Sequence, residues 1–317
     1  MLKWHLMKRR EFIKRVGLGL AAGWAGGGLA WPRRAWAAAP ELRLALLADA
    51  HLKDGDDRRP EAMALARAVA EIRGLSPPPD LVLFAGDLAH RGRPDALDLG
   101  REIFGDLPAP VWPVWGEGYH GPGGKAAWVR RFGESRFSRA YQGVQVIGLE
   151  TSFNRTSQGQ VFEIGAAQRQ WLARELARLT PTTPLVVLSH APLARLFHPW
   201  QQWTADAPEV ARLLARFSRV LCVHGHVHAA GIGEAGARND GNDGNNFGSL
   251  SLTENRKLKT ENLLIHCGLP ATAWPRPLAM QGTPAAPRPG LGPRGCGWAL
   301  ATLSHTSSHI QPYLWQT

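Results

Sequence analysis

Short apolar runs alternate with helical patterns along most of this chain, and this alternation limits the folds open to it. Apolar runs of strand length cover 42–48, 81–85, 111–115, 145–149, 185–188 and 220–223. Helix-forming stretches separate many of them, at 60–73, 94–104, 125–132, 166–179 and 208–217. Several of the runs are apolar throughout instead of alternating between apolar and polar residues, so they are typical of strands buried on both faces. The pattern therefore predicts an α/β fold.

The first 39 residues resemble a twin-arginine (Tat) export signal. Arg9 and Arg10 form the arginine pair, Phe12 is the hydrophobic residue two places later, and the uncharged, Gly- and Ala-rich stretch 16–31 follows. A small-x-small site that ends at Ala37 is suited to signal peptidase. The uncharged stretch has 16 residues, fewer than the roughly 20 apolar residues that a membrane span needs.

These features predict two regions in the chain. Residues 1–39 are the Tat signal peptide, cleaved near Ala37, and residues 40–317 form one large mature domain. We expect the Tat export machinery to be a partner during transport and the mature protein to be periplasmic or extracellular. We expect no stable membrane span in the mature chain.

Most of the excess positive charge lies in this export signal. The formal net charge of the whole chain is +11, from 37 Lys and Arg against 26 Asp and Glu. Eight of the basic residues and one acidic residue, Glu11, fall within 1–39, which leaves +4 on residues 40–317. Proteins that bind polyanions present dense clusters of Lys and Arg, and the sequence after residue 39 has no dense Lys/Arg run. We therefore expect no nucleic-acid partner.

Five short polar blocks follow apolar runs, where side chains at strand ends can converge. Together they offer two carboxylates and five imidazoles, which suit two hard or borderline divalent cations that share a carboxylate. In the last block, two histidines one residue apart in an extended segment point to the same face, and His224 is expected on the opposite face. The blocks are Asp49-Ala50-His51, Gly86-Asp87, Gly118-Tyr119-His120-Gly121, Ser189-His190-Ala191 and Gly225-His226-Val227-His228.

In this order, the blocks resemble the motifs of the calcineurin-like metallophosphoesterase superfamily, which are Asp-x-His, Gly-Asp, Gly-Asn-His-Asp/Glu, His and Gly-His-x-His. The resemblance implies a two-sheet αββα sandwich. Apolar runs without helices at 262–267, 298–303 and 309–314 fit its mainly antiparallel C-terminal finish. It also implies a first metal site formed by Asp49, His51, Asp87 and His228, and a second that uses Asp87, His190 and His226.

The third block departs from this pattern at the metal-binding Asn. If the block aligns directly, Tyr119 stands at that position, and a phenol with a reference pKa near 10 is a poor ligand for a hard divalent cation. If Gly116-Glu117 aligns with Gly-Asn instead, two residues are inserted and Glu117 offers a carboxylate oxygen. Both alignments retain His120, which by resemblance contacts the substrate phosphate and the leaving group. Glu117 and Tyr119 are thus alternative candidates for the last ligand.

By resemblance, the chain is expected to be a metal-dependent phosphoric ester hydrolase with two divalent cations, such as Mn, Fe or Zn. A metal-activated bridging water would attack phosphorus, and His120 would steady the transition state or protonate the leaving oxygen. Residues 86–92 resemble the cyclic-nucleotide and Icc-like phosphodiesterase branch, so the expected substrate is a small phosphate ester, a diester ahead of a monoester. An alternative is a degenerate phosphoesterase with an incomplete second metal site that acts as an exported binding protein.

The three cysteines lack the spacing of a zinc site. Cys222 lies within an apolar run and is predicted to be a buried small hydrophobe. Cys267 and Cys296 both lie in the C-terminal region, and an oxidising compartment permits a disulfide between them. The sequence leaves their pairing open.

Overall fold

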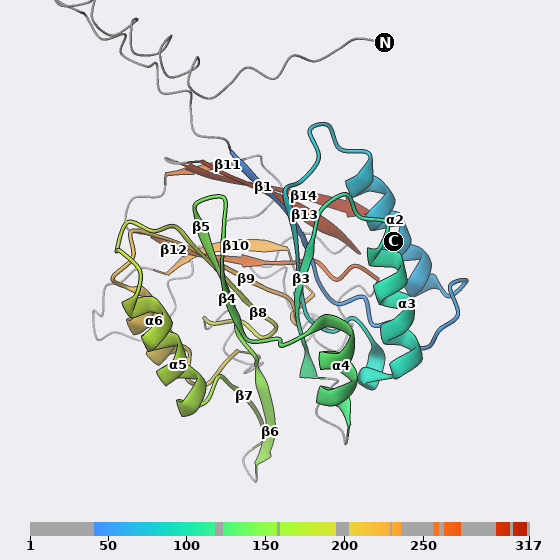
Figure 1. Ribbon diagram of the computed structural model, residues 1–317, viewed down its shortest axis with the longest axis horizontal. Helices are drawn as coiled ribbons and strands as arrows, with labels where there is room; N and C mark the ends of the chain where they lie inside the picture. The colour runs from blue at the N-terminus through green and yellow to red at the C-terminus, as the bar shows by residue number, and fades with distance from the viewer. Residues whose placement is uncertain are drawn as a thin grey trace, which may run out of the picture. The chain divides into compact units, whose positions relative to one another are not determined.

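Two six-stranded β-sheets pack face to face in the computed structural model, with helices over their outer faces (Figure 1). The structure describes residues 41–117, 123–156, 159–194, 203–228, 230–235, 256–259, 263–273, 296–304 and 307–315. The predicted signal peptide 1–39 lies outside these residues, and so do Tyr119 and His120. Within the described part of the chain, no helix is both long and apolar enough to cross a membrane.

The first sheet contains the three strands that begin the domain. Strands β1 (Leu42–Leu47), β2 (Leu81–Ala85) and β3 (Val111–Val114) are parallel neighbours. Helices α2 (Pro60–Arg73) and α3 (Pro94–Phe104), with the 3-10 turn η1 (His90–Gly92), lie between them in sequence. On the other side of β1, the sheet continues with antiparallel strands: β13 (Cys296–Leu303), β14 (Ser307–Trp315) and β11 (Arg256–Lys259).

The second sheet has a parallel centre and antiparallel edges. Its four central strands are β5 (Val144–Gly148), β8 (Leu185–Ser189), β9 (Arg219–His224) and β12 (Leu263–Gly268). Its edges are β4 (Phe137–Tyr141) beside β5 and β10 (Gly231–Ala235) beside β12. The helices that follow α3 are α4 (Gly124–Phe132), α5 (Ala166–Ala177) and α6 (Ala207–Leu214).

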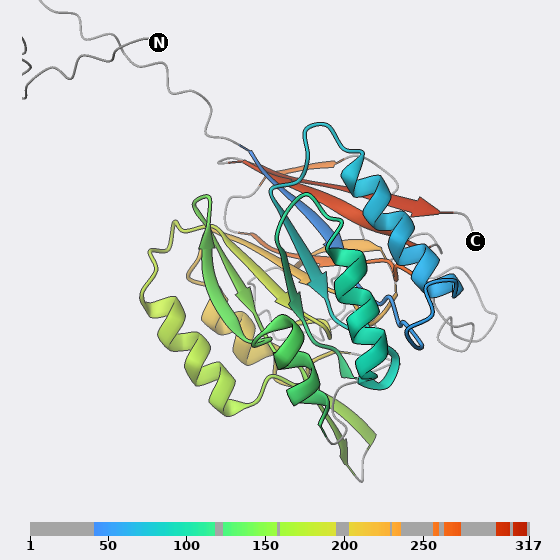
Figure 2. The same cartoon turned by 45° about the vertical axis from the view of Figure 1, so that its right-hand side comes forward.

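A two-stranded hairpin extends from the second sheet. Strands β6 (Ser152–Thr156) and β7 (Gly159–Glu163) follow the carboxyl end of β5 and project beyond both sheets (Figure 2). Their base is held to the domain by Asp206, whose carboxylate accepts hydrogen bonds from the backbone N–H groups of Ile164 and Gly165, at 2.9 and 2.8 Å. The hairpin therefore has a fixed base at the end of the sheet where the parallel strands finish.

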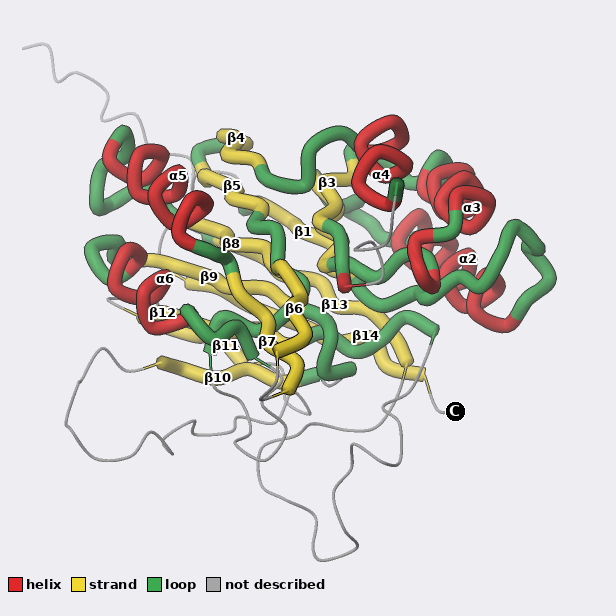
Figure 3. Tube along the Cα trace, turned by 90° about the horizontal axis from the view of Figure 1, so that it is seen from below, coloured by secondary structure: helices red, strands yellow, loops and turns green. Residues whose placement is uncertain are grey.

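Three apolar layers account for the sandwich. One lies between the sheets and includes Leu44, Leu83, Val186 and Val223. A second packs the first sheet against α2, α3 and α4, and a third packs the second sheet against α5 and α6; Figure 3 shows these two groups of helices on opposite sides of the strands. Because both faces of each central strand are covered, these strands need apolar residues at every position.

The predicted fold class is confirmed, because the layers run helix, sheet, sheet, helix. The helices predicted at 60–73 and 94–104 and the strand at 81–85 have the predicted bounds. Strands β4, β10 and β11 and the β6–β7 hairpin were missed, since their sequences are polar or mixed. The C-terminal finish is antiparallel in β13 and β14, whereas β12 runs parallel to β9.

The cysteines are free thiols buried in different layers. Cys222 packs between the second sheet and its helices, as predicted. Cys267 lies between the sheets, whereas Cys296 lies under the helices of the first sheet. No disulfide joins these two residues in the structure, and burial raises the pKa of the Cys267 thiol to about 12.

Candidate metal centre

The predicted ligands that the structure describes gather beyond the carboxyl ends of five strands, three from the first sheet and two from the second. Every carboxylate comes from the first sheet: Asp49 follows β1, Asp87 follows β2 and Glu117 follows β3. His51 also follows β1. The other imidazoles come from the second sheet, where His190 follows β8 and both His226 and His228 follow β9. Convergence at this edge is the usual location of sites in α/β sheets.

Backbone hydrogen bonds fix the loops that carry these residues. The N–H groups of Asp49 and His51 donate to the carbonyls of Gly86 and Asp87, both at 2.9 Å, so the loops after β1 and β2 run side by side. In the second sheet, the N–H of Gly225 donates to the carbonyl of His190 at 3.1 Å. The loops that carry these side chains are therefore held by hydrogen bonds between neighbouring backbone segments.

Five of the predicted ligands have a left-handed backbone conformation, which is uncommon outside glycine. A non-glycine residue in this region costs about 1–3 kcal/mol, and such residues cluster at functional sites. The turn away from the strand direction brings each side chain back over the strand ends. The five residues and their φ angles are Asp49 (55°), His51 (49°), Asp87 (53°), His226 (65°) and His228 (48°).

Two glycines allow the strand ends to approach these side chains. A Cβ at Gly116 would overlap the carboxylate of Asp87. A Cβ at Gly86, whose φ is +91°, would lie 2.5 Å from Nδ1 of His190. The close contacts between β2, β3 and β8 thus depend on the absence of a side chain at both positions.

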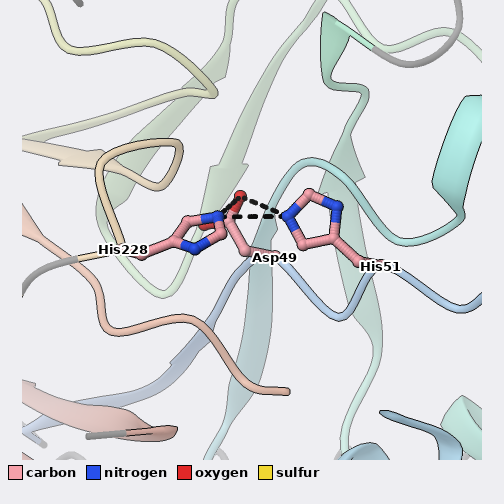
Figure 4. A group of neighbouring side chains, drawn as sticks. All are labelled: Asp49, His51 and His228. Atoms are coloured by element: carbon pink, nitrogen blue, oxygen red, sulfur yellow. Dashed lines mark hydrogen bonds and ion pairs between the residues drawn. The ribbon is translucent and has the colours of Figure 1, made fainter. Parts of the chain in front are cut away.

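The first cluster contains Asp49, His51 and His228, which point toward one another (Figure 4). Oδ1 of Asp49 lies 3.4 Å from Nε2 of His228 and 3.7 Å from Nε2 of His51, and the two Nε2 atoms are 3.1 Å apart. The Asp49 side chain is fully buried. One oxygen and two imidazole nitrogens therefore face a common point in a region shielded from water.

The second cluster contains Glu117, His190 and His226. One carboxylate oxygen of Glu117 contacts Nε2 of His190, and the other lies 3.2 Å from Nδ1 of His226. Of the two candidates for the last ligand, Glu117 lies in this cluster, and Tyr119 is outside the described residues. A carboxylate thus stands beside the two imidazoles where the family pattern has an amide.

Asp87 lies between the two clusters. Its Oδ2 atom is 3.7 Å from Nδ1 of His51 on one side and 3.9 Å from Nε2 of His190 on the other. A carboxylate with one neighbour in each cluster can serve both of two adjacent cations. The arrangement therefore has the form of two sites that share one residue.

Hydrogen bonding fixes the orientation of His190. Its Nδ1–H donates to the backbone carbonyl of Ala85 at 2.8 Å, which leaves Nε2 directed at the cluster. A second-shell bond of this kind sets the tautomer of an imidazole and makes the free nitrogen a better ligand. On the far side, the ring of His226 packs against Phe162 from the base of the β6–β7 hairpin, with centroids 4.5 Å apart.

In several groups of the two clusters, nearby opposite charges outweigh the effect of burial on the pKa. Burial raises the pKa of Glu117, but the His226 and His190 imidazoles outweigh it and hold this pKa well below its usual range. Burial lowers the pKa of His190, but Glu117 and Asp87 outweigh it and raise this pKa well above 6.5. In the first cluster, burial lowers the pKa of His51 to about 4, whereas Asp49 raises that of His228.

One atom that faces the first cluster, Oδ1 of Asp49, is buried with no hydrogen-bond partner among the described residues. Buried polar atoms are nearly always paired, so such atoms require an explanation. Carboxylate oxygens together with imidazole nitrogens suit borderline divalent cations such as Zn, Mn or Fe. The residues present therefore fit a pair of metal ions. His224, expected on the opposite face, is buried and belongs to neither cluster.

Comparison with known proteins assigns the chain to a class. Residues 42–230 match the family model of the calcineurin-like phosphoesterases. The match covers more than half of the chain and includes every ligand candidate named above, so the chain belongs to the calcineurin-like phosphoesterase family. The prediction of the family is confirmed, and membership agrees with the predicted class of metal-dependent hydrolase.

Two curated relatives are phosphodiesterases by name. The chain is 30% identical over 168 residues to a cAMP/cGMP dual specificity phosphodiesterase of Mycobacterium tuberculosis, covering 49% of this chain and 51% of the relative. It is 25% identical over 173 residues to a probable glycerophosphodiester phosphodiesterase of Arcobacter nitrofigilis, covering 52% and 62%. The matched region thus spans between half and two thirds of each relative's length.

Among solved structures, the fold resembles that of a purple acid phosphatase from yellow lupin (Lupinus luteus). The TM-score is 0.61 at 13% identity, over 87% of this chain and 52% of the other. At this identity the likeness concerns the fold alone. The assignment of particular residues as ligands stays a prediction, and so does the role of His120, which lies outside the described residues.

Two contributors to the centre were missed from the sequence. Ala85 acts through its backbone carbonyl, which no side-chain pattern can reveal. Phe162 belongs to the β6–β7 hairpin, whose polar sequence gave no strand signal. A motif search identifies residues that can bind metal but not the groups that orient them.

Proposed function

We propose that this chain is an exported, metal-dependent phosphodiesterase with two metal sites. The observation that carries the proposal is the position of Asp87 between two clusters of buried carboxylate and imidazole groups. Asp49, His51, Asp87 and His228 would hold one cation. Asp87, Glu117, His190 and His226 would hold the other, with Glu117 in place of the family's Asn.

The proposed reaction is hydrolysis of a phosphate ester by water. Two divalent cations bound here would lower the pKa of a water that attacks phosphorus and would neutralise charge on the phosphoryl oxygens. His190 contributes a fixed tautomer, because its Nδ1–H is held by the Ala85 carbonyl. The buried Asp49 and Asp87 hold negative charge where bulk water is excluded. His120 would protonate the leaving oxygen.

A small phosphodiester is the proposed substrate. Both curated relatives are named as phosphodiesterases, one for cyclic nucleotides and one for glycerophosphodiesters. These names support the class of bond, and the identity of the groups on either side of phosphorus is not part of the proposal. The net charge of +4 outside the first 39 residues supports a small substrate over a nucleic acid.

Export by the Tat machinery is part of the proposal and rests on the sequence of residues 1–39. A protein that must acquire metal and fold before transport suits this route. Replacing both Arg9 and Arg10 with Lys should retain the protein inside the cell, measured by cell fractionation of the expressing bacterium. Periplasmic recovery of the Lys variant at the level of the natural sequence would contradict Tat export.

The catalytic proposal is tested by metal analysis and turnover on one preparation. Purified protein should bind two equivalents of Mn²⁺ and hydrolyse bis-p-nitrophenyl phosphate, with activity lost on chelation and restored by Mn²⁺. Binding of fewer than one equivalent without metal-dependent turnover would contradict it. That outcome would favour a degenerate phosphoesterase that serves as an exported binding protein.

A further inference from the structure

Glu117 is a carboxylate at a position where the family pattern has a neutral amide, and this difference has a chemical consequence. We propose that Glu117 is a specificity-determining residue that reduces the preference of the metal centre for doubly charged phosphomonoesters and so favours singly charged phosphodiesters. The inference rests on the proposed function and deepens it, because it concerns the charge of the substrate.

The charge of the loaded centre depends on its carboxylates. Two divalent cations bring four positive charges, whereas Asp49 and Glu117 lie in the two clusters and Asp87 lies between them. The carboxylates offset three of these charges and leave one. With an amide at position 117, two positive charges would remain. The extra positive charge would favour a dianion more than a monoanion, so the carboxylate removes an advantage that monoesters would otherwise have.

The location of Glu117 makes its charge matter to a substrate. Its side chain is 28% exposed, whereas those of Asp49 and Asp87 are 0% and 6% exposed. Of the three carboxylates, Glu117 is thus the one that reaches the surface from which a phosphate ester must approach. Water and salt screen a charge at a partly exposed site less than a charge on an open surface. The Glu117 carboxylate therefore still acts on a neighbouring phosphate.

The carboxylate of Glu117 is also held in place. One oxygen contacts Nε2 of His190 and the other lies 3.2 Å from Nδ1 of His226, so both oxygens face the cluster. The preceding residue, Gly116, packs against Asp87 with no room for a side chain, which fixes the backbone that carries Glu117. Because its two oxygens and its backbone are both held, the Glu117 carboxylate has little freedom to turn away from an incoming anion.

The test compares the natural protein with Glu117→Gln, which keeps the side-chain length and removes the charge. At pH 8, p-nitrophenyl phosphate carries two negative charges and bis-p-nitrophenyl phosphate carries one. The ratio of kcat/KM for the monoester to that for the diester should rise by about tenfold or more in the variant. Glu150→Gln removes a carboxylate outside the clusters, paired with Lys125, and should leave the ratio unchanged.

Equilibrium binding gives a readout that does not depend on turnover. With Mn²⁺-loaded protein, calorimetry should show inorganic phosphate binding about tenfold more tightly to Glu117→Gln than to the natural protein, and diethyl phosphate changing much less. The Mn²⁺ content of each sample is measured alongside. An equal change for both anions, or no change for phosphate, would overturn the inference.

A second measurement covers the case in which Glu117→Gln fails to fold or to keep both cations. In the natural protein, phosphate affinity should change by less than about threefold between pH 5.5 and pH 8, although the second proton of phosphate is lost near pH 6. Diethyl phosphate has no such proton, so it reports any other pH effect. Phosphate affinity that rises about tenfold or more relative to diethyl phosphate overturns the inference, whereas absence of turnover on both esters contradicts the proposed function itself.

Discussion

The backbone N–H of His226 donates a hydrogen bond to Oδ2 of Asp49 at 3.0 Å, and this bond joins the first and last polar blocks of the centre. The two oxygens of the Asp49 carboxylate therefore have different roles. Oδ2 holds the loop after β9, and Oδ1 faces His51 and His228. Asp49 is therefore both a ligand candidate and the group that positions the loop of two other candidates.

Asp49→Asn should separate these two roles. The amide oxygen can still accept the hydrogen bond from His226, but the charge that favours a cation is lost. We expect the variant to bind one equivalent of Mn²⁺ less than the natural protein, measured by elemental analysis. The unfolding temperature of the metal-free form should be lower, because the buried His228 loses the charge of its partner. Asp98→Asn, which changes a surface carboxylate paired with Arg131, serves as the control and should keep full metal content.

Gly86→Ala should disturb the second cluster by steric overlap. Its Cβ would lie 2.5 Å from Nδ1 of His190, so the imidazole and its bond to Ala85 must shift. Gly143→Ala is the matched control, because its φ is also positive, +83°, and nothing lies within 4 Å of the added Cβ. Both variants should lose about 1 kcal/mol of folding free energy from backbone strain, but we expect reduced metal affinity in Gly86→Ala alone.

Calorimetric titration of the two alanine variants with Mn²⁺ distinguishes the effects. Equal losses of stability with equal metal affinities would show that the close approach of Gly86 to His190 has no role in binding. A tenfold or larger loss of affinity at the second site, seen in Gly86→Ala and absent in Gly143→Ala, is the expected result.

Metal uptake should release protons. Asp49, after the burial cost is overcome, raises the pKa of His228, and Glu117 likewise raises that of His190, so both imidazoles hold protons in the metal-free protein. A cation must displace these protons to bind. Apparent Mn²⁺ affinity should therefore fall as the pH is lowered from 8 to 6. Titration calorimetry in buffers of different ionisation enthalpy measures the proton release directly, and a binding enthalpy independent of buffer would contradict it.

Acid should destabilise the metal-free protein through buried neutral imidazoles. Burial lowers the pKa of His266 to about 3 and that of His224 to about 4, against about 6.5 in an unfolded chain. Between these values and pH 6.5 the unfolded chain binds more protons than the folded one, so the free energy of unfolding falls as the pH is lowered. We expect the unfolding temperature to drop between pH 6.5 and pH 4.

His266→Leu should weaken this dependence, since it removes one of the buried imidazoles that stay neutral in the folded protein. Thermal unfolding followed by circular dichroism over this pH range provides the comparison. A slope in His266→Leu equal to that of the natural protein would rule out His266 as a source of acid sensitivity.

The sequence predicted the central layers and the ligand candidates because both depend on local patterns. Fully apolar strands such as Leu81–Ala85 are distinct from amphipathic helices, and His226 and His228 share a short motif. Strand β4, with Ser138 and Arg139 in its centre, sits at an edge and needs no continuous apolar run, so it was missed. The sequence left Glu117 and Tyr119 as alternatives, because two alignments of the third block are possible; the structure describes only Glu117 of the two.

The division of the centre between the two sheets has a consequence for how the protein can fail. Each cluster takes its carboxylate from one sheet and at least one imidazole from the other. Metal occupancy therefore depends on the position of the two sheets relative to each other. A chain whose sheets slide by a fraction of a residue would retain its helices and strands yet lose its cations, so metal content would register damage that circular dichroism does not see.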